Sequence, residues 1–213
     1  CLIRKMLLET IMRRIKENRI VLASHNKGKL KEISELFDPF KIQTLPISHF
    51  SDNEPKETED TFIGNARIKA HYAAKHSNLL SLSDDSGIMI DALNGAPGVY
   101  TADWAETKNG RDFNHAMTKV WKLLDSIKAP KPIKAKFICV LCLAWPDGHD
   151  ETFEGTISGQ ISWPMRGKNG FGFDPIFIPD GYEITFAEME PEKKHKINHR
   201  HNAFRKLIDA CLS

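Results

Sequence analysis

Residues 20–30 have the sequence Ile20-Val21-Leu22-Ala23-Ser24-His25-Asn26-Lys27-Gly28-Lys29-Leu30, which predicts a strand that passes through a polar loop into a helix. The short apolar run 20–23 is typical of a buried strand, and apolar residues recur with a helical period over 30–37. A loop at a helix N-terminus presents backbone amides to anions, and Lys29 adds a charge suited to phosphate. The loop 24–29 is therefore a candidate phosphate site. A polar turn capped by Asn26 explains the same residues equally well.

The rest of the chain predicts a mixed α/β fold. We expect strands at 41–45, 79–82, 88–93, 135–145, 151–163 and 175–178, and helices at 61–77, 113–127 and 202–212. Strand–helix units followed by a hairpin, whose turn lies at 146–149, indicate a mixed twisted sheet flanked by helices. Residues 1–18 are expected to be an N-terminal extension without a role.

Composition excludes several classes of protein. The formal net charge of +2 over 213 residues lacks the strong basic stripe of a nucleic-acid binder. No apolar run approaches the roughly 18 residues of a membrane span. Few cysteines and no secretory signal favour a reducing cytoplasm. Cys139 and Cys142 lie three apart in an expected strand and point to opposite faces, so we expect them to be core residues.

A second group is Ser83-Asp84-Asp85-Ser86-Gly87, expected at the end of a strand. Adjacent carboxylates there are costly unless they face water or a cation. Because neighbouring strand residues point apart, the two aspartates should play different parts. One of them can bind Mg²⁺, which favours one or two carboxylates together with substrate phosphates. A turn built of good turn formers is the alternative interpretation.

Two charged residues could join this group. Glu57 precedes the helix expected at 61–77 and could be a second metal ligand, and Lys69 on that helix could reach phosphates. Solvated surface charges are the ordinary explanation of both.

A third group is Gly170-Phe171-Gly172-Phe173-Asp174-Pro175. Aromatic rings set among glycines suit a flat ligand lying on a ring, and Asp174 could accept from a base N–H. Further on, Arg200 could bond a base edge with two donors, and His199 could bridge to base or phosphate. A buried aromatic turn and ordinary helix capping are the alternatives.

In this order, the motifs resemble those of the Ham1-like inosine triphosphate pyrophosphatase family, from about Arg19 to Ala210. The similarity is carried by the loop 24–29, Thr61-Phe62-x-x-Asn65-Ala66, Asp84-Asp85-Ser86-Gly87 with Gly95-Ala96-Pro97-Gly98, the segment 170–175 and Asn198-His199-Arg200. The resemblance implies a single domain over 19–213, with two lobes and a central cleft, that usually forms a homodimer. It also implies hydrolysis of inosine, deoxyinosine and xanthosine triphosphates to the monophosphate and pyrophosphate.

The resemblance implies a role for each matching residue. The residues that would contact phosphate are Ser24, His25, Asn26, Lys27, Gly28, Lys29 and Lys69. Glu57 and Asp85 would bind magnesium, Asp85 would also accept a proton, and Ser86 would contact the substrate. The base pocket would consist of Phe171, Gly172, Phe173, Asp174, Lys194, His199 and Arg200. The sequence departs from the family at His25, commonly Gly, and at Asn198, usually Ser.

Two other functions stay open. One is a Maf-like pyrophosphatase that acts on pyrimidine or modified nucleotides. The other is a nucleotide-binding module without catalysis. The adjacent Asp84 and Asp85 disfavour the module, because two carboxylates repel phosphate unless a metal intervenes.

Overall fold

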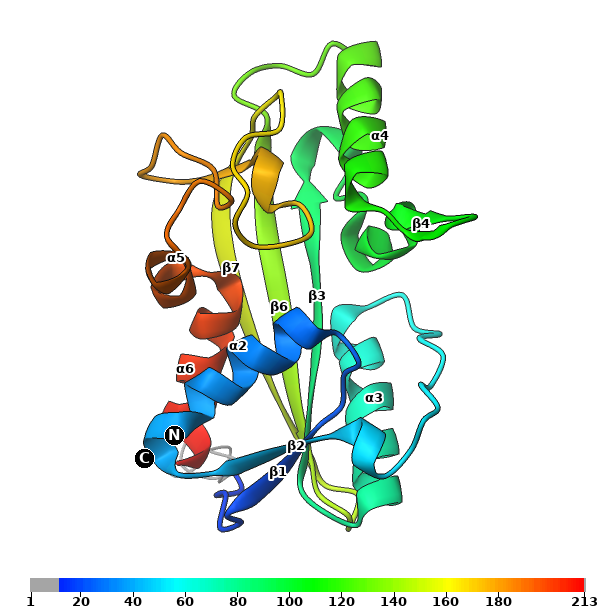
Figure 1. The fold of residues 1–213 in the computed structure, drawn as a ribbon, viewed down its shortest axis with the longest axis vertical. Helices are drawn as coiled ribbons and strands as arrows, with labels where there is room; N and C mark the ends of the chain where they lie inside the picture. The colour runs from blue at the N-terminus through cyan, green and yellow to red at the C-terminus, as the bar shows by residue number, and fades with distance from the viewer. Residues whose placement is uncertain (1–11, 213) are drawn as a thin grey trace, which may run out of the picture.

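A six-stranded sheet of order β2-β1-β3-β6-β7-β8 forms the centre of the protein (Figure 1). The computed structural model describes residues 12–212. Its strands are β1 (Arg19–Leu22), β2 (Gln43–Pro46), β3 (Ser81–Ile90), β4 (Glu106–Thr107), β5 (Gly110–Arg111), β6 (Lys134–Ala144), β7 (Asp150–Ile161) and β8 (Phe177–Pro179). Its α-helices are α2 (Lys27–Phe37), α3 (Phe62–Ser77), α4 (Phe113–Ser126), α5 (Pro191–Ile197) and α6 (His199–Cys211).

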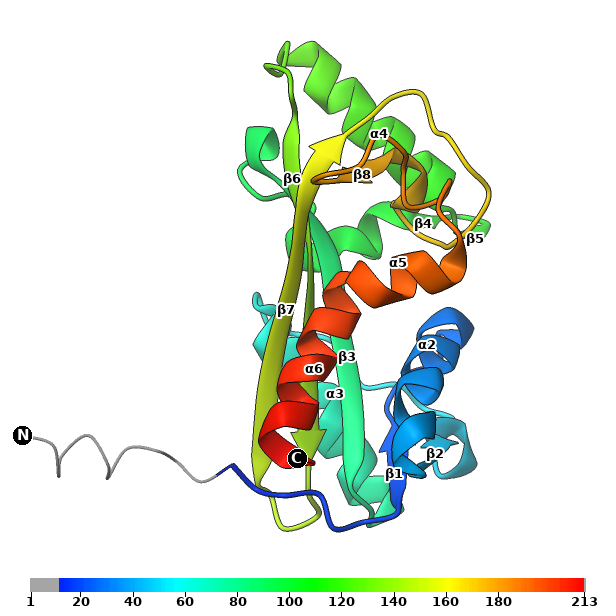
Figure 2. The same cartoon turned by 90° about the vertical axis from the view of Figure 1, so that its left-hand side faces the viewer.

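The sheet is mixed, as predicted. β1 pairs in parallel with β2 and β3, whereas β3, β6, β7 and β8 pair antiparallel. The long strands β3, β6 and β7 run through most of the length of the molecule (Figure 1). Figure 2 shows α2, α5 and α6 on the same side of this sheet.

Two large hydrophobic clusters occupy the two ends of the long strands. At one end, Phe37 of α2 and Leu207 of α6 pack against the sheet with Leu141. At the other end, Val120 of α4 packs with Ile88 and with residues around β8. A smaller cluster joins α3 to the opposite face of β6. Each end therefore has its own core, which gives the two lobes that the resemblance implies.

The expected strands at 79–82 and 88–93 are instead joined in one strand, β3, so this prediction was wrong. β3 pairs with β6 from Ser81 to Ile90, whereas β1 pairs with β3 only at Ser81 and Leu82. Beyond Leu82, the β1 side of β3 is therefore open to other groups. Asp84 and Asp85 lie at this point, within the strand rather than at its end.

Helix boundaries near the predicted motifs also differ from expectation. α2 begins at Lys27, because the Asn26 side chain caps it. α6 begins at His199 rather than at residue 202, because the Asn198 side chain accepts from the His201 amide. The short helix α5, which carries Lys194, was not predicted. Its residues between Pro191 and Ile197 are all polar, so they show no apolar periodicity.

Helix α6 lies unusually close to strand β7 at Gly155. A Cβ atom at Gly155 would lie 2.2 Å from the backbone nitrogen of Ala203 and 2.2 Å from the carbonyl oxygen of His199. Only glycine permits this approach, because those neighbours are backbone atoms that no rotamer change can move.

The expected extension is partly integrated into the fold. Ile15 is buried in the cluster around α6, and its amide donates to the Cys211 carbonyl at 2.9 Å. The Arg13 guanidinium lies 4.7 Å from the centroid of the Trp145 ring. Ile15 and Arg13 thus pack against the fold, whereas 1–11 lie outside the described residues, and the lack of a role stays a prediction.

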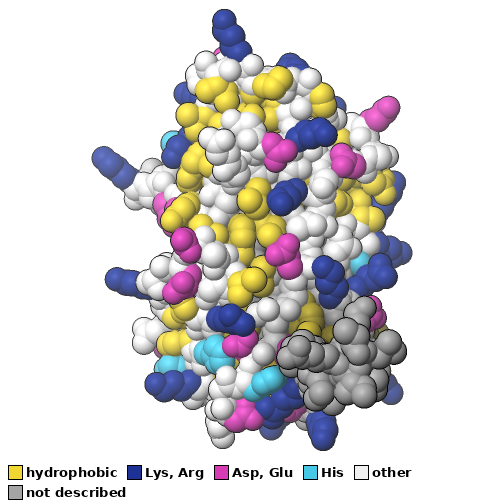
Figure 3. All heavy atoms as spheres, turned by 180° about the vertical axis from the view of Figure 1, so that it is seen from behind, with side chains coloured by type: hydrophobic (Ala, Val, Ile, Leu, Met, Phe, Trp, Pro, Cys, Tyr) yellow, Lys and Arg dark blue, Asp and Glu magenta, His cyan; other side chains and the backbone are white. Residues whose placement is uncertain are grey.

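The helices described over 12–212 include none that is long and apolar enough to cross a membrane. On the face that Figure 3 shows, Lys and Arg side chains are dispersed among Asp and Glu and form no basic stripe. This agrees with the small net charge.

Candidate active site

A cleft of about 710 Å³ collects most of the predicted site residues. Its lining includes Ser24, His25, Asn26, Lys29, Glu57, Lys69, Asp85, Ser86, Phe171, Gly172, Phe173, Asp174, Lys194, His199 and Arg200. Of the predicted set, Lys27 and Gly28 do not line it. A Cβ at Gly28 would lie 3.3 Å from the Phe171 ring, so this glycine lets the first turn of α2 lie close to Phe171.

The loop before α2 is a capped turn. Asn26 Oδ1 accepts from the amides of Gly28 at 2.9 Å and Lys29 at 3.1 Å, and Ser24 Oγ accepts from the Asn26 amide at 3.1 Å. These amides are therefore engaged within the loop. The charge that reaches into the cleft is the Lys29 ammonium, which pairs with Asp84.

Asp84 is the fully buried centre of a charge cluster. It accepts from Arg200 Nε at 2.8 Å, from Cys139 Sγ at 3.0 Å and from Ser86 Oγ at 3.0 Å, and it pairs with Lys29. Burial alone would raise its pKa, but Arg200 and Lys29 outweigh burial and hold the pKa of Asp84 well below its usual range. Asp84 is therefore a permanent anion that fixes its neighbours. Cys139 is buried as predicted, yet it also contacts this cluster.

Asp85 faces a different set of groups, as the alternation of a strand requires. Its Oδ1 accepts from Lys69 Nζ at 2.9 Å, and the same ammonium donates to Glu57 Oε1 at 2.5 Å. Its Oδ2 is buried without a hydrogen-bond partner among the described residues. Burial raises the pKa of Asp85 to about 6, and Lys69 and Lys29 offset only part of this rise. A carboxylate so placed can accept a proton near neutral pH.

The donor set fits a hard divalent cation. Glu57 and Asp85 converge on one position, where the Lys69 ammonium now binds both, and Asp85 keeps one oxygen unpartnered. Across residues 12–212, no group of three or more His, Cys, Asp or Glu side chains could hold a metal. Two carboxylates nevertheless suffice for Mg²⁺ when substrate phosphates complete its shell.

The opposite wall of the cleft carries the glycine-rich loop. Asp174 Oδ2 accepts from Lys194 Nζ at 2.6 Å and from the Phe171 amide at 2.8 Å. Burial raises the pKa of Asp174, and Lys194 offsets part of the rise. Phe171 is 37% exposed and can offer a ring face to a ligand, whereas Phe173 is buried and packs edge-on against Phe113.

His199 and Arg200 reach the cleft from the first turn of α6. The His199 ring stacks on Phe137 with 4.9 Å between centroids, and its Nδ1 has no partner within the described part of the chain. Burial and Arg200 lower the pKa of His199, so the ring is neutral. The Arg200 guanidinium pairs with Asp84 and Glu32 and lies 3.4 Å from Ser86 Oγ. Most of its donors are thus engaged by protein, and its predicted contact with a base edge stays a prediction.

Two residues around the cleft were not predicted as site residues. Glu32 does not line the cleft, but it is buried behind it and pairs with Arg200. Asn65 lines the cleft, and its Oδ1 accepts from the Glu59 amide at 3.0 Å. Asn65 precedes Lys69 by one helical turn and helps to hold the loop that carries Glu57.

A Gly170→Ala substitution is expected to disrupt the glycine-rich loop. Gly170 has φ +74°, and a Cβ there would lie 2.0 Å from Asp174 Oδ2. We expect the Asp174–Lys194 pair to break and KM for the nucleotide to rise about tenfold, which corresponds to roughly 1.4 kcal/mol. Gly181→Ala is the matched control, because Gly181 has φ +82° and open space around its Cβ position. An equal KM in both variants would contradict this role of the loop.

Comparison with known proteins agrees with this geometry. Residues 20–210 match the Ham1 family. A dITP/XTP pyrophosphatase of Ruegeria pomeroyi is 56% identical over 193 residues, covering 91% of this chain and 95% of that one. A dITP/XTP pyrophosphatase of Agrobacterium fabrum is 51% identical over 212 residues, covering 94% and 99%.

Solved structures give the same result. A HAM1 protein from Coxiella burnetii superposes with a TM-score of 0.81 at 40% identity, covering 89% of this chain and 95% of that one. The Staphylococcus aureus Ham1 protein superposes with a TM-score of 0.77 at 37% identity, with the same coverage. The fold and cleft define a two-lobed α/β protein with a charged cleft. The chain belongs to the Ham1 family, which confirms the resemblance and the predicted fold class.

Proposed function

We propose that the protein hydrolyses the triphosphates of deaminated purines, namely ITP, dITP and XTP, to the monophosphate and pyrophosphate. The names of the Ruegeria and Agrobacterium relatives support this activity. The observation that carries it is the convergence of Glu57 and Asp85 on Lys69, beside an unpartnered Asp85 oxygen in the cleft.

In the proposed reaction, Asp85 accepts a proton from a water whose oxygen attacks the α-phosphorus in line. The bond between the α-phosphorus and its bridging oxygen breaks, and pyrophosphate departs with that oxygen. Lys29 and Lys69 are the cations that meet the leaving group, and both already line the cleft. Asp84 orients Lys29 and Arg200 without taking part in proton transfer.

We propose Mg²⁺ as the cation that Glu57 and Asp85 would hold. When bound, it would neutralise charge on the phosphate oxygens. The two carboxylates are otherwise satisfied by Lys69, so their arrangement already suits a positive charge.

The base is proposed to lie between Phe171 and the His199 side of the cleft. Phe171 offers an exposed ring face, and Lys194 Nζ lies 5.0 Å from that ring. Selectivity would rest on the purine 6-oxo group, because adenine has a donor there and would leave a buried donor of the protein unpaired. Arg200 Nη2 and the unpartnered His199 nitrogen are the groups nearest to free for this purpose.

A panel of nucleoside triphosphates assayed with Mg²⁺ tests the proposal. We expect pyrophosphate from dITP, ITP and XTP, with ATP slower by 10² or more, as expected for rejection by unpaired polar groups. Release of orthophosphate instead would contradict cleavage at the α-phosphorus.

The same panel separates the alternatives. Faster turnover of TTP or UTP would favour the Maf-like activity. Tight magnesium-independent binding without any turnover would favour a non-catalytic module.

We further propose that the protein is a cytoplasmic homodimer, as the resemblance and the cysteine content imply. A solution measurement of molar mass tests the assembly.

A further inference from the structure

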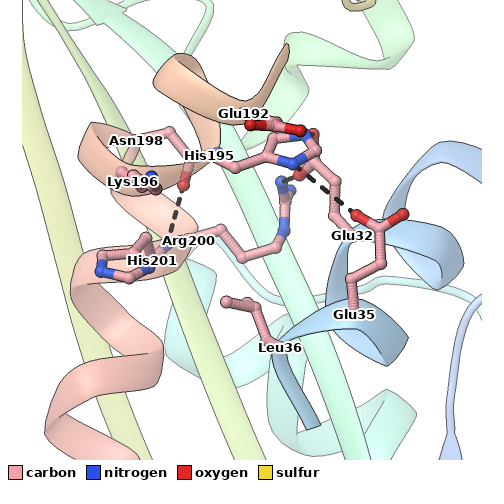
Figure 4. A pocket seen from close by; sticks show the side chains of 9 residues that line it. All are labelled: Glu32, Glu35, Leu36, Glu192, His195, Lys196, Asn198, Arg200 and His201. Atoms are coloured by element: carbon pink, nitrogen blue, oxygen red, sulfur yellow. Dashed lines mark hydrogen bonds and ion pairs between the residues drawn. The ribbon is translucent and has the colours of Figure 1, made fainter. Parts of the chain in front are cut away.

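A second cavity, of about 280 Å³, lies between α2 and the α5–α6 junction (Figure 4). It is lined by Glu32, Glu35, Leu36, Glu192, His195, Lys196, Asn198, Arg200 and His201. Three residues of these helices line the cleft: Lys194 of α5, Arg200 of α6 and Lys29 of α2. The contact across this cavity therefore joins the element that carries base-site residues to the element that carries the phosphate-site lysine.

His195 spans the cavity. Its Nε2 lies 3.3 Å from Glu32 Oε1 and its Nδ1 lies 3.7 Å from Glu35 Oε2, so one ring faces two carboxylates of α2. Figure 4 shows Glu32 and Glu35 reaching from α2 toward His195 of α5. The His195 side chain is 32% exposed, so protons from solvent reach it.

From His195 a continuous series of ion pairs leads into the active-site cleft. Glu32 pairs through its other oxygen with Arg200, Arg200 pairs with Asp84, and Asp84 pairs with Lys29. Arg200 lines both the cavity and the cleft. The Glu32–Arg200 ion pair therefore lies between the cavity and the cleft.

Charged and titratable groups face His195 from three helices. Glu32 and Glu35 face it from α2, where Lys31 lies 3.8 Å from Glu35. The groups on α5 are Glu192, Lys194 and Lys196, and those on α6 are Arg200 and His201. Of these, the cavity lining holds three carboxylates against the two permanent cations Lys196 and Arg200. A charged ring at this position would attract both α2 carboxylates, whereas a neutral ring would donate a single hydrogen bond.

We propose that His195 is a positioning residue for nucleotide binding. In its charged form it ties α5 to α2 through Glu32 and Glu35, and so keeps the base-site and phosphate-site groups at their working separation. In its neutral form the tie weakens, and affinity for the nucleotide falls. This inference rests on the proposed function of the cleft.

The test compares three forms of the full chain. The dissociation constant of a non-hydrolysable dITP analogue is measured by calorimetry at pH 6 and pH 8 for the wild type, His195→Gln and His195→Arg. Glutamine is neutral and arginine is charged throughout this range. The ratio of the dissociation constant at pH 8 to that at pH 6 measures the effect of the charge at residue 195. Titration of the ligand itself affects this ratio equally in all three proteins.

We expect the wild-type ratio to exceed that of both variants by about fivefold, the effect of one partly exposed ion pair. His195→Gln should bind the analogue weakly at both pH values. His195→Arg should bind it tightly at both. His201→Gln is the control, since His201 lines the same cavity but pairs with neither α2 carboxylate within the described contacts. Thermal melts verify that each variant is folded.

The outcomes separate this inference from the proposed function. Equal ratios in all proteins, with the wild type still releasing pyrophosphate from dITP, would overturn the role of His195 alone. A wild type that neither binds nor hydrolyses dITP would overturn the proposed function. A change in His201→Gln equal to that in His195→Gln would also overturn the inference, because it would reflect the cavity charge rather than the tie.

Discussion

An Asp85→Asn variant is expected to lose turnover by at least 10²–10⁴-fold, the range that a positioned general base supplies. Asparagine keeps the shape of the side chain and can still contact Lys69, but it cannot accept the proton of the attacking water. Asp85 has a raised pKa of about 6 and one unpartnered oxygen, so no other described cleft carboxylate matches it. Pyrophosphate release at saturating dITP measures the loss, and calorimetry with a non-hydrolysable analogue should show binding changed by only a few-fold.

Glu59→Gln provides the matched control. Glu59 also lines the cleft, but it is held through its backbone amide by Asn65 rather than by contact with Lys69. Removing its charge should change turnover by less than about twofold, since exposed charges interact weakly. Retained turnover in Asp85→Asn would remove Asp85 as the base, and an equal loss in both variants would assign the effect to the overall field of the cleft.

An Arg200→Met variant is expected to lose about 3–5 kcal/mol of stability, the cost of removing one partner from a buried ion pair. Methionine fills part of the space, yet Asp84 and Glu32 then lie buried without the guanidinium that now binds both. For a chain of this length, the melting temperature should fall by about 10 °C. Arg205→Met is the control, because Arg205 is an exposed residue of the same helix and should cost less than about 0.5 kcal/mol.

The pH dependence of this loss has a definite sign. In the wild type the pKa of Asp84 lies well below its ordinary value of 3.8, so its contribution is complete above that value and is lost only as the pH falls through the lower folded value. In Arg200→Met, Asp84 loses the guanidinium that does most to lower its pKa, so that pKa rises and acid relieves the variant. The stability difference should therefore be largest near pH 7 and narrow below about pH 4. A difference that is constant with pH would mean that packing, not charge, causes the loss.

Much of the architecture could be predicted because it depends on local patterns. The strand before Ser24, the hairpin of β6 and β7, and the helices α3 and α4 each carry their own periodicity, and the structure has them within a few residues of expectation. β3 was divided in error because Asp84 and Asp85 read as a turn. Their burial depends on Lys29, Arg200 and Lys69, which come from three other elements. No local pattern contains that information.

The site shows the same division. The cleft does gather the predicted groups, since motifs at the ends of β1, in β3 and at the start of α6 meet there. What sequence could not supply was their pairing. Arg200 was expected to face a base, yet Glu32 and Asp84 engage it. Lys69 was expected to face phosphate, yet it bridges Glu57 and Asp85. The roles of these residues toward a nucleotide stay predictions.

The close approach of α6 to β7 at Gly155 has a consequence for how variation in this chain should be interpreted. His199 and Arg200 lie on the first turn of α6, which packs directly against Gly155 of β7. The depth to which these two side chains enter the cleft therefore depends on the absence of a side chain at Gly155. Any larger residue at that position would lift the helix as a rigid body. A change on β7 that does not itself line the cleft would then imitate, in a substrate-preference assay, a mutation of the proposed base pocket.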